Sequence, residues 1–139
     1  VVRLAQDLVH ATDSPLARQV AAHGWRWLEA RVARGLQRYP SGVLLADAER
    51  SHAPLHVVVV GPKADAAARA LFDAARAHPA PHVWTEWLDH AEGPLASTRV
   101  ELPRLPAPAA FVCAEARCSS PARTPAALAE AIARLLVGP

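Results

Sequence analysis

The stretch that decides the fold is LHVVVV, residues 55–60, which is followed directly by the turn-forming pair Gly61-Pro62. Four consecutive valines are typical of a strand buried on both faces, because a strand with one solvent-exposed face alternates apolar and polar residues. We therefore expect residues 57–60 to form the most buried strand of a sheet that has helices packed on it.

The sequence after this strand predicts a β-α-β unit. Residues 64–78 have helical spacing of their apolar positions, and residues 82–88 alternate as a second strand does. Two strands joined by a helix are expected to lie parallel, with a right-handed crossover. A further short strand is expected around residues 98–102.

The last part of the chain predicts a hairpin and a helix. AAFVC, residues 109–113, is an apolar strand-like run, and the segment AEAR is short enough to return the chain to Cys118 as a hairpin. Thr124-Pro125 then supplies a capping residue followed by Pro at the first helical position, which predicts a last helix.

The residues before the valine run are helical in pattern. Residues 1–11, 15–38 and 43–49 show helical periodicity, with a break at residues 39–42. We expect an αα-hairpin in an incomplete helical layer, since such pairs usually pack against more helices than this segment contains. Its two tryptophans, Trp25 and Trp27, lie about 200° apart around a helix, so they cannot both face one partner.

These patterns together predict an α/β fold with two parts. A helical segment is expected over residues 1–53, and a small α/β domain with a mixed, mainly parallel sheet and packed helices over residues 54–139. A chain of 139 residues is long enough to bury a core without disulfides or metals.

Composition excludes several classes of partner. The 15 basic and 13 acidic residues give a formal net charge of +2, and the arginines are not clustered, so we expect no nucleic-acid binding. No apolar run approaches the roughly 18 residues of a membrane span, and signal-peptide features are absent, so we expect no membrane association. Two cysteines are far short of a secreted disulfide scaffold, which favours a cytoplasmic location. The absence of Met and a start within helical periodicity favour a fragment or a processed product.

The first candidate site is the turn after the valine run, GPKADAA, residues 61–67. Amides at a helix N-terminus and a Lys can hold an anion, and open α/β sheets bind ligands at the carboxyl ends of parallel strands. Gly61 and Lys63 are therefore the ligand-binding candidates. The turn lacks the glycines of a P-loop or a dinucleotide fingerprint, so an ordinary strand-to-helix turn is the alternative.

The second candidate site is the pair Cys113 and Cys118. A hairpin would bring their Cα atoms within the roughly 4.4–6.8 Å that a disulfide allows. Buried structural thiols, a disulfide or redox pair, and a metal site are the three interpretations. The spacing is not that of a C-x-x-C motif, and no second pair completes a zinc site. We expect two reduced, poorly reactive thiols, because the cytosol keeps most thiols reduced.

No other residues form a recognisable catalytic set. The seven His are scattered, no Ser or Cys stands beside an orienting base, and Glu86 and the other carboxylates are not paired by their spacing. We predict no catalytic residues, no metal site and no cofactor.

Two long segments carry a family resemblance. PLHVVVVGPKADAAARALFDAARA, residues 54–77, and AAFVCAEARCSSPARTPAALAEAIARLL, residues 109–136, resemble the C-terminal end of the thioredoxin-domain-containing proteins related to spermatogenesis-associated protein twenty. The most specific element is an aromatic-Val-Cys segment followed by a second Cys and a Pro: Phe111, Val112, Cys113, Cys118 and Pro121. Residues 4–49 are similar to the last helices of that family's α/α toroid.

The resemblance implies a place in a larger protein. Members of the family combine a thioredoxin-like N-terminal domain, a helical toroid similar to that of sugar-processing enzymes, and a small α/β C-terminal region. Their thioredoxin-type cysteine motif belongs to the N-terminal domain, so the resemblance assigns that chemistry to no residue of this chain.

The expected function follows from the resemblance and from the lack of a catalytic set. We expect a non-catalytic structural and interface module of a carbohydrate-related, thioredoxin-domain-containing protein, which could itself be an enzyme of unknown substrate. The expected partner is the remainder of the parent chain or a second copy. The alternatives are a thiol-redox module that uses Cys113 and Cys118, and small-molecule binding near Gly61 and Lys63.

Overall fold

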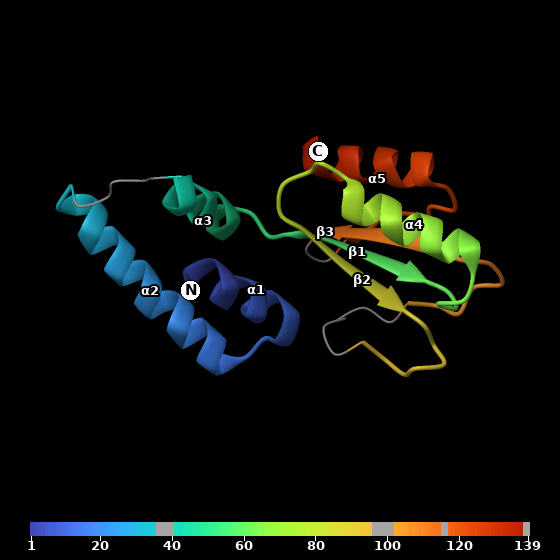
Figure 1. The fold of residues 1–139 in the computed structure, drawn as a ribbon, viewed down its shortest axis with the longest axis horizontal. Helices are drawn as coiled ribbons and strands as arrows, with labels where there is room; N and C mark the ends of the chain where they lie inside the picture. The colour runs from blue at the N-terminus through green and yellow to red at the C-terminus, as the bar shows by residue number, and fades with distance from the viewer. Residues whose placement is uncertain (36–40, 96–101, 115–116, 138–139) are drawn as a thin grey trace. The chain divides into compact units, whose positions relative to one another are not determined.

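The computed structural model describes residues 1–35, 41–95, 102–114 and 117–137, and Figure 1 shows its ribbon. The chain divides into two compact units, Val1–His52 and Ala53–Pro139. The boundary lies one residue before the division that the sequence predicts.

The first unit is helical. It contains α1 (Val2–Thr12), α2 (Pro15–Ala33) and α3 (Ser41–Ser51). The start of α2 follows from its sequence, because Pro15 occupies the first turn and the Ser14 side chain accepts a hydrogen bond from the Ala17 amide. The predicted break at residues 39–42 is only partly right: α3 already begins at Ser41, and residues 39–40 lie outside the described residues.

Small residues set the packing within this unit. α1 contacts both α2 and α3, and Arg50 of α3 reaches Glu29 and Trp25 of α2. A Cβ atom at Gly24 would lie 2.5 Å from Cγ2 of Val2, which is closer than packed atoms approach. Glycine at this position therefore permits the observed contact between α1 and α2.

The second unit is built on a mixed sheet. Its strands are β1 (Leu55–Val60), β2 (Val83–Leu88), β3 (Ala109–Ala114) and β4 (Arg117–Cys118), in the order β2-β1-β3-β4. β1 and β2 are parallel, as the predicted β-α-β unit requires, whereas β3 is antiparallel to both β1 and β4.

The α/β class and the mixed sheet are confirmed, but the expectation that most pairs are parallel is wrong. Only one of the three strand pairings is parallel. The reason lies in the connection over residues 89–108, whose described part contains no helix. Ala109 pairs with Val60, so β3 starts beside the carboxyl end of β1 and runs antiparallel to it. A parallel strand would instead need a crossover to the other end of the sheet.

Two helices cover one face of the sheet. α4 (Ala66–Ala77) and α5 (Pro125–Val137) lie side by side there (Figure 1). Asp65 caps α4, since its carboxylate accepts hydrogen bonds from the Ala67 and Ala68 amides. The core between helices and sheet contains Val57 and Val59 together with side chains from α4, α5 and β3.

The long connection covers part of the other face. Val58 and Val60 pack there in a cluster with Leu88, Phe111 and Cys113, and leucines of the connection pack against it: Leu95, Leu102 and Leu105. All four valines of β1 are 0–2% exposed, which confirms the prediction of a strand buried on both faces. The predicted strand around residues 98–102 falls mainly on residues 98–101, which lie outside the described residues, and Leu102 is not in a strand.

One helix supplies a test of this core with its own control. Ile132 of α5 is fully buried, whereas Leu136 on the same helix is 45% exposed. We predict that Ile132→Ala lowers the free energy of unfolding by about 2–5 kcal/mol, the usual loss for an aliphatic side chain in a packed core. Leu136→Ala should lower it by less than about 1 kcal/mol. Urea unfolding followed by circular dichroism measures both, and equal losses would contradict this description of the core.

Candidate functional site

The turn at Gly61 is fixed by its surroundings. Its φ of 154° favours glycine, and a Cβ atom would lie 3.0 Å from the Cβ of Pro108. The Gly61 amide donates to the Leu88 carbonyl at 3.0 Å, and its carbonyl accepts from the Trp87 indole at 2.9 Å. Gly61 thus joins the ends of β1 and β2 to the connection, and packing explains its presence.

Lys63 is engaged by carboxylates of the same chain. Its backbone amide donates to Oδ2 of Asp89 at 2.9 Å, and its Nζ lies 2.6 Å from Oε2 of Glu92. The other carboxylate oxygen of Asp89 accepts from the Ala91 amide at 3.0 Å. The hydrogen bond from the Lys63 amide, followed by that from Ala91, lowers the pKa of Asp89. An anionic ligand at Gly61 and Lys63 would have to displace both carboxylates.

The cysteines come together as the hairpin predicts. Cys113 on β3 faces Cys118 on β4, with 4.0 Å between their Cα atoms. The Ser119 amide donates to the Val112 carbonyl at 2.8 Å, which makes the neighbouring pair of cysteines a non-hydrogen-bonded pair, the closer of the two kinds.

The oxidation state differs from the expected one. The two sulfurs form a disulfide, so the expectation of two reduced thiols is wrong for this structure. That expectation rested on the cellular compartment alone, whereas the facing positions of a tight hairpin bring the sulfurs within bonding reach. Cys113 is 6% exposed and buried in the cluster under the connection, whereas Cys118 is exposed.

A polar pair on the same sheet face was missed by the sequence reasoning. Nε2 of His56 lies 2.6 Å from Oε2 of Glu86, and their side chains are 24% and 18% exposed. The treatment of His56 as a scattered histidine and of Glu86 as an unpaired carboxylate is therefore wrong. The sequence contained a signal for this contact, because His56 and Glu86 are the single titratable residues of the two strands of one β-α-β unit.

The strand register aligns His56 with the cysteines. His56 is the register partner of Trp84 on β2 and of Cys113 on β3, and Cys113 is the partner of Cys118 on β4. The four residues form one row across the sheet, on the face that bears Val58 and Val60, because alternate strand residues share a face. The row lies at the end of β1 opposite Gly61.

The helical unit has a different feature: most of the apolar side chains that it buries are small, whereas many of its large apolar side chains are exposed. The hydrophobic residues that it buries are Ala5, Ala17, Ala21, Trp25 and Ala46. Nine of the ten large hydrophobic side chains recorded as exposed in the described residues belong to it: Val1, Leu4, Leu8, Leu16, Val20, Trp27, Val32, Leu44 and Leu45. The two tryptophans differ as expected, with Trp25 8% exposed and Trp27 54% exposed.

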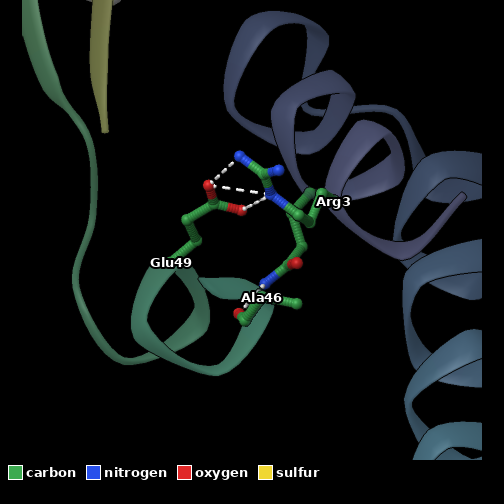
Figure 2. A network of polar contacts seen from close by, with 4 residues as sticks. Arg3, Ala46 and Glu49 are labelled. Carbon is green, nitrogen blue, oxygen red and sulfur yellow. Dashed lines mark hydrogen bonds and ion pairs between the residues drawn. The ribbon is translucent and has the colours of Figure 1, made fainter. Parts of the chain in front are cut away.

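The exposed side chains border two open grooves. One, of about 260 Å³, lies between α1 and α2 and is lined by Leu4, Leu8, Leu16 and Val20 among others. The second, of about 680 Å³, is lined by residues of all three helices, including Trp27 and Leu28. Figure 2 shows how α3 is tied to α1 beside them, where the guanidinium of Arg3 donates to both carboxylate oxygens of Glu49 at 2.5–3.0 Å.

Other kinds of site were sought in the part of the chain that the structure describes. No three His, Cys, Asp or Glu residues there are grouped so that they could hold a metal ion. No helix in that part combines the length and the apolar character needed to cross a membrane.

Comparisons with known proteins add no family assignment. No protein-family model, no curated protein and no solved structure matches the chain. Functional conclusions therefore rest on the geometry of the two units.

The disulfide makes a first prediction for this site. It closes a loop with a sequence separation of 5, for which chain-entropy arguments give a stabilisation of about 2 kcal/mol. Treatment with a phosphine reductant should lower the free energy of unfolding by about that amount. A Cys113→Ala/Cys118→Ala variant should not respond to the reductant. Alkylation without reduction, read by mass spectrometry, should label neither cysteine in the untreated chain, and full labelling would contradict the structure.

The Asp89 contacts lead to a second prediction, which concerns how stability depends on pH. Because the pKa of Asp89 is lowered by folding, its carboxylate adds stability above the pKa of the unfolded chain, and this contribution is lost as the pH falls through the folded value. Asp89→Asn should therefore destabilise the chain at neutral pH, and the difference should disappear in acid. Urea unfolding at both pH values measures this, with Asp73→Asn on the exposed side of α4 as the charge-matched control. A difference that does not depend on pH would contradict the assignment.

Proposed function

We propose that this chain is a structural and interface module whose helical unit docks onto further helices of a larger protein. The observation that carries the proposal is the reversed distribution of apolar side chains, in which alanines are buried and leucines are exposed. Monomeric soluble proteins rarely expose large contiguous apolar patches, and such patches mark interaction sites.

The shape of the surface supports helices as the occupant. The grooves run between helices, and the first is lined by aliphatic side chains one helical turn apart: Leu4 and Leu8 on α1, and Leu16 and Val20 on α2. Helices pack by placing ridges of side chains into grooves of this kind. The Arg3–Glu49 ion pair and the close contact at Gly24 hold the three helices of the unit together, so that the grooves are formed before a partner arrives.

The resemblance to the thioredoxin-domain-containing family supplies the identity that we propose for these helices. They would be helices of an α/α toroid in the same parent chain, in a carbohydrate-related protein, and the location would be cytoplasmic. The α/β unit has two apolar clusters of its own, so in this proposal it is an independently packed domain of the same chain. The near-neutral charge of +2 supports a protein partner over nucleic acid.

The proposal predicts the behaviour of the chain by itself. With the grooves empty, a second copy is the nearest available apolar surface, so the chain should self-associate at millimolar concentration and dissociate at micromolar concentration. The variant Leu4→Ser/Leu8→Ser/Leu16→Ser should stay monomeric, because it removes the aliphatic lining of one groove. Sedimentation velocity measures the change in mass.

The control for this experiment lies on the other unit. Leu136 of α5 is 45% exposed, comparable to Leu8 at 44%, and Leu136→Ser should leave self-association unchanged. A chain that remains monomeric at millimolar concentration, or a triple variant that associates like the unsubstituted chain, would contradict the proposal.

A further inference from the structure

The sheet face that the connection only partly covers brings a disulfide and a histidine–carboxylate pair together. Cys113 is the register partner of both Cys118 and His56, and His56 contacts Glu86 at 2.6 Å. Register partners on one face have Cβ atoms about 4.5–5.5 Å apart, so His56 and Cys113 are neighbouring positions on this face. Neither the interface role nor the packing of the core requires this combination.

We propose that this row is a thiol–disulfide exchange site, in which the Cys113–Cys118 disulfide accepts two electrons from a dithiol substrate and His56, oriented by Glu86, stabilises the sulfur that leaves. The substrate class is a peptide or small molecule that carries two neighbouring thiols. This activity goes beyond the interface role of the helical unit and does not depend on it.

Burial determines which sulfur is attacked. Cys118 belongs to a two-residue edge strand and is exposed, whereas Cys113 is 6% exposed. An incoming thiolate can therefore approach Sγ of Cys118 and not Sγ of Cys113. Cys113 becomes the leaving group, and it is the cysteine that pairs with His56 in the register.

The exchange proceeds in two balanced steps. A substrate thiolate attacks Sγ of Cys118, a new sulfur–sulfur bond forms, and the bond between Cys118 and Cys113 breaks with its electron pair on Cys113. The protonated imidazole of His56 stabilises this thiolate and then transfers its proton to it. The second substrate thiolate attacks the substrate sulfur of the mixed disulfide and releases Cys118 as a thiolate, which takes a proton from water. The substrate dithiol is oxidised to a disulfide, and the protein disulfide is reduced to two thiols.

Glu86 acts through His56. Its carboxylate engages Nε2, which leaves Nδ1 as the ring nitrogen not held by Glu86, and a carboxylate at one nitrogen fixes the orientation of the ring. Glu86 is a positioning residue in this scheme. The other side chains of note on this face of the described strands are the two disulfide-bonded cysteines, and the described part of the connection over residues 89–108 carries Asp89, His90, Glu92 and Arg104.

The hairpin stays closed after reduction, which makes the site reversible. The Ser119 amide bonds to the Val112 carbonyl at 2.8 Å, and Ala110 and Ala122 exchange two backbone hydrogen bonds of 2.8 Å. The Ser119 hydroxyl also accepts from the Val112 amide at 3.1 Å. The two thiols therefore remain neighbours, so when the exchange runs in reverse and a disulfide substrate is reduced to its dithiol, the step that re-forms the Cys113–Cys118 bond is intramolecular. In the cytoplasmic setting proposed above, the disulfides that do form are usually transient, and they serve catalysis or redox sensing.

The test measures how fast dithiothreitol reduces the disulfide of the full chain between pH 6 and pH 9, the range across which an ordinary imidazole loses its proton. The unsubstituted chain should react faster than the oxidised peptide CAEARC, residues 113–118, which has the same loop but no His56. His56→Gln should slow the reaction about tenfold near pH 6, because the leaving thiolate loses its cationic neighbour. The difference should vanish near pH 9, whereas His52→Gln, just after the end of α3, should change nothing.

Two results would overturn the proposal. One is reduction of the full chain no faster than that of the peptide, and the other is a His56→Gln rate equal to the unsubstituted rate at every pH. Circular dichroism checks that His56→Gln is folded, and if it is not, Glu86→Gln replaces it. Glu86→Gln should give a smaller slowing with the same pH trend, and an unchanged profile there would also reject the assignment.

Discussion

Burial of β1 on both faces is the constraint on which the α/β unit depends. A strand of four consecutive valines that are 0–2% exposed needs one apolar layer above it and another below it. Helices α4 and α5 supply the first layer, and the connection over residues 89–108 contributes leucines to the second. The described part of that connection contains no helix, and β3 runs antiparallel to β1. The row of His56, Cys113 and Cys118 lies on the same face, and Cys113 itself belongs to the cluster that the connection covers.

The sequence predicts the elements whose signal is local and the contacts that one strand register determines. The double burial of β1, the parallel β1–β2 pair and the Cys113–Cys118 hairpin were all predictable, because each depends on residues close in sequence or on a single β-α-β unit. The direction of β3 was not predictable, since the sequence of the connection does not show at which end of the strands the chain re-enters the sheet. The His56–Glu86 contact joins residues 30 positions apart, and finding it requires the register of β1 and β2 in addition to their existence.

The candidate sites show the same division. Lys63 was singled out because a lysine near a helix N-terminus suggests an anion site, but residues after β2 supply the anions from within the chain. Cys113 and Cys118 were singled out by spacing, and geometry then changed their expected oxidation state. The neighbours of these cysteines could not be read from the sequence, because β1 contributes His56 from the opposite end of the unit.

The small side chains buried in the helical unit have a thermodynamic consequence. Burial energy scales with apolar area, at about 25 cal/mol per Å², and an alanine contributes little of it. Opening of the helical unit therefore costs less burial free energy than opening of the α/β unit, whose core contains Val57, Val59, Leu71, Leu128 and Ile132. Local openings of α1 to α3 should exchange amide hydrogens well before β1 does. Two compact units that bury unequal apolar areas are expected to unfold as separate cooperative units, so a single melting temperature would describe neither of them.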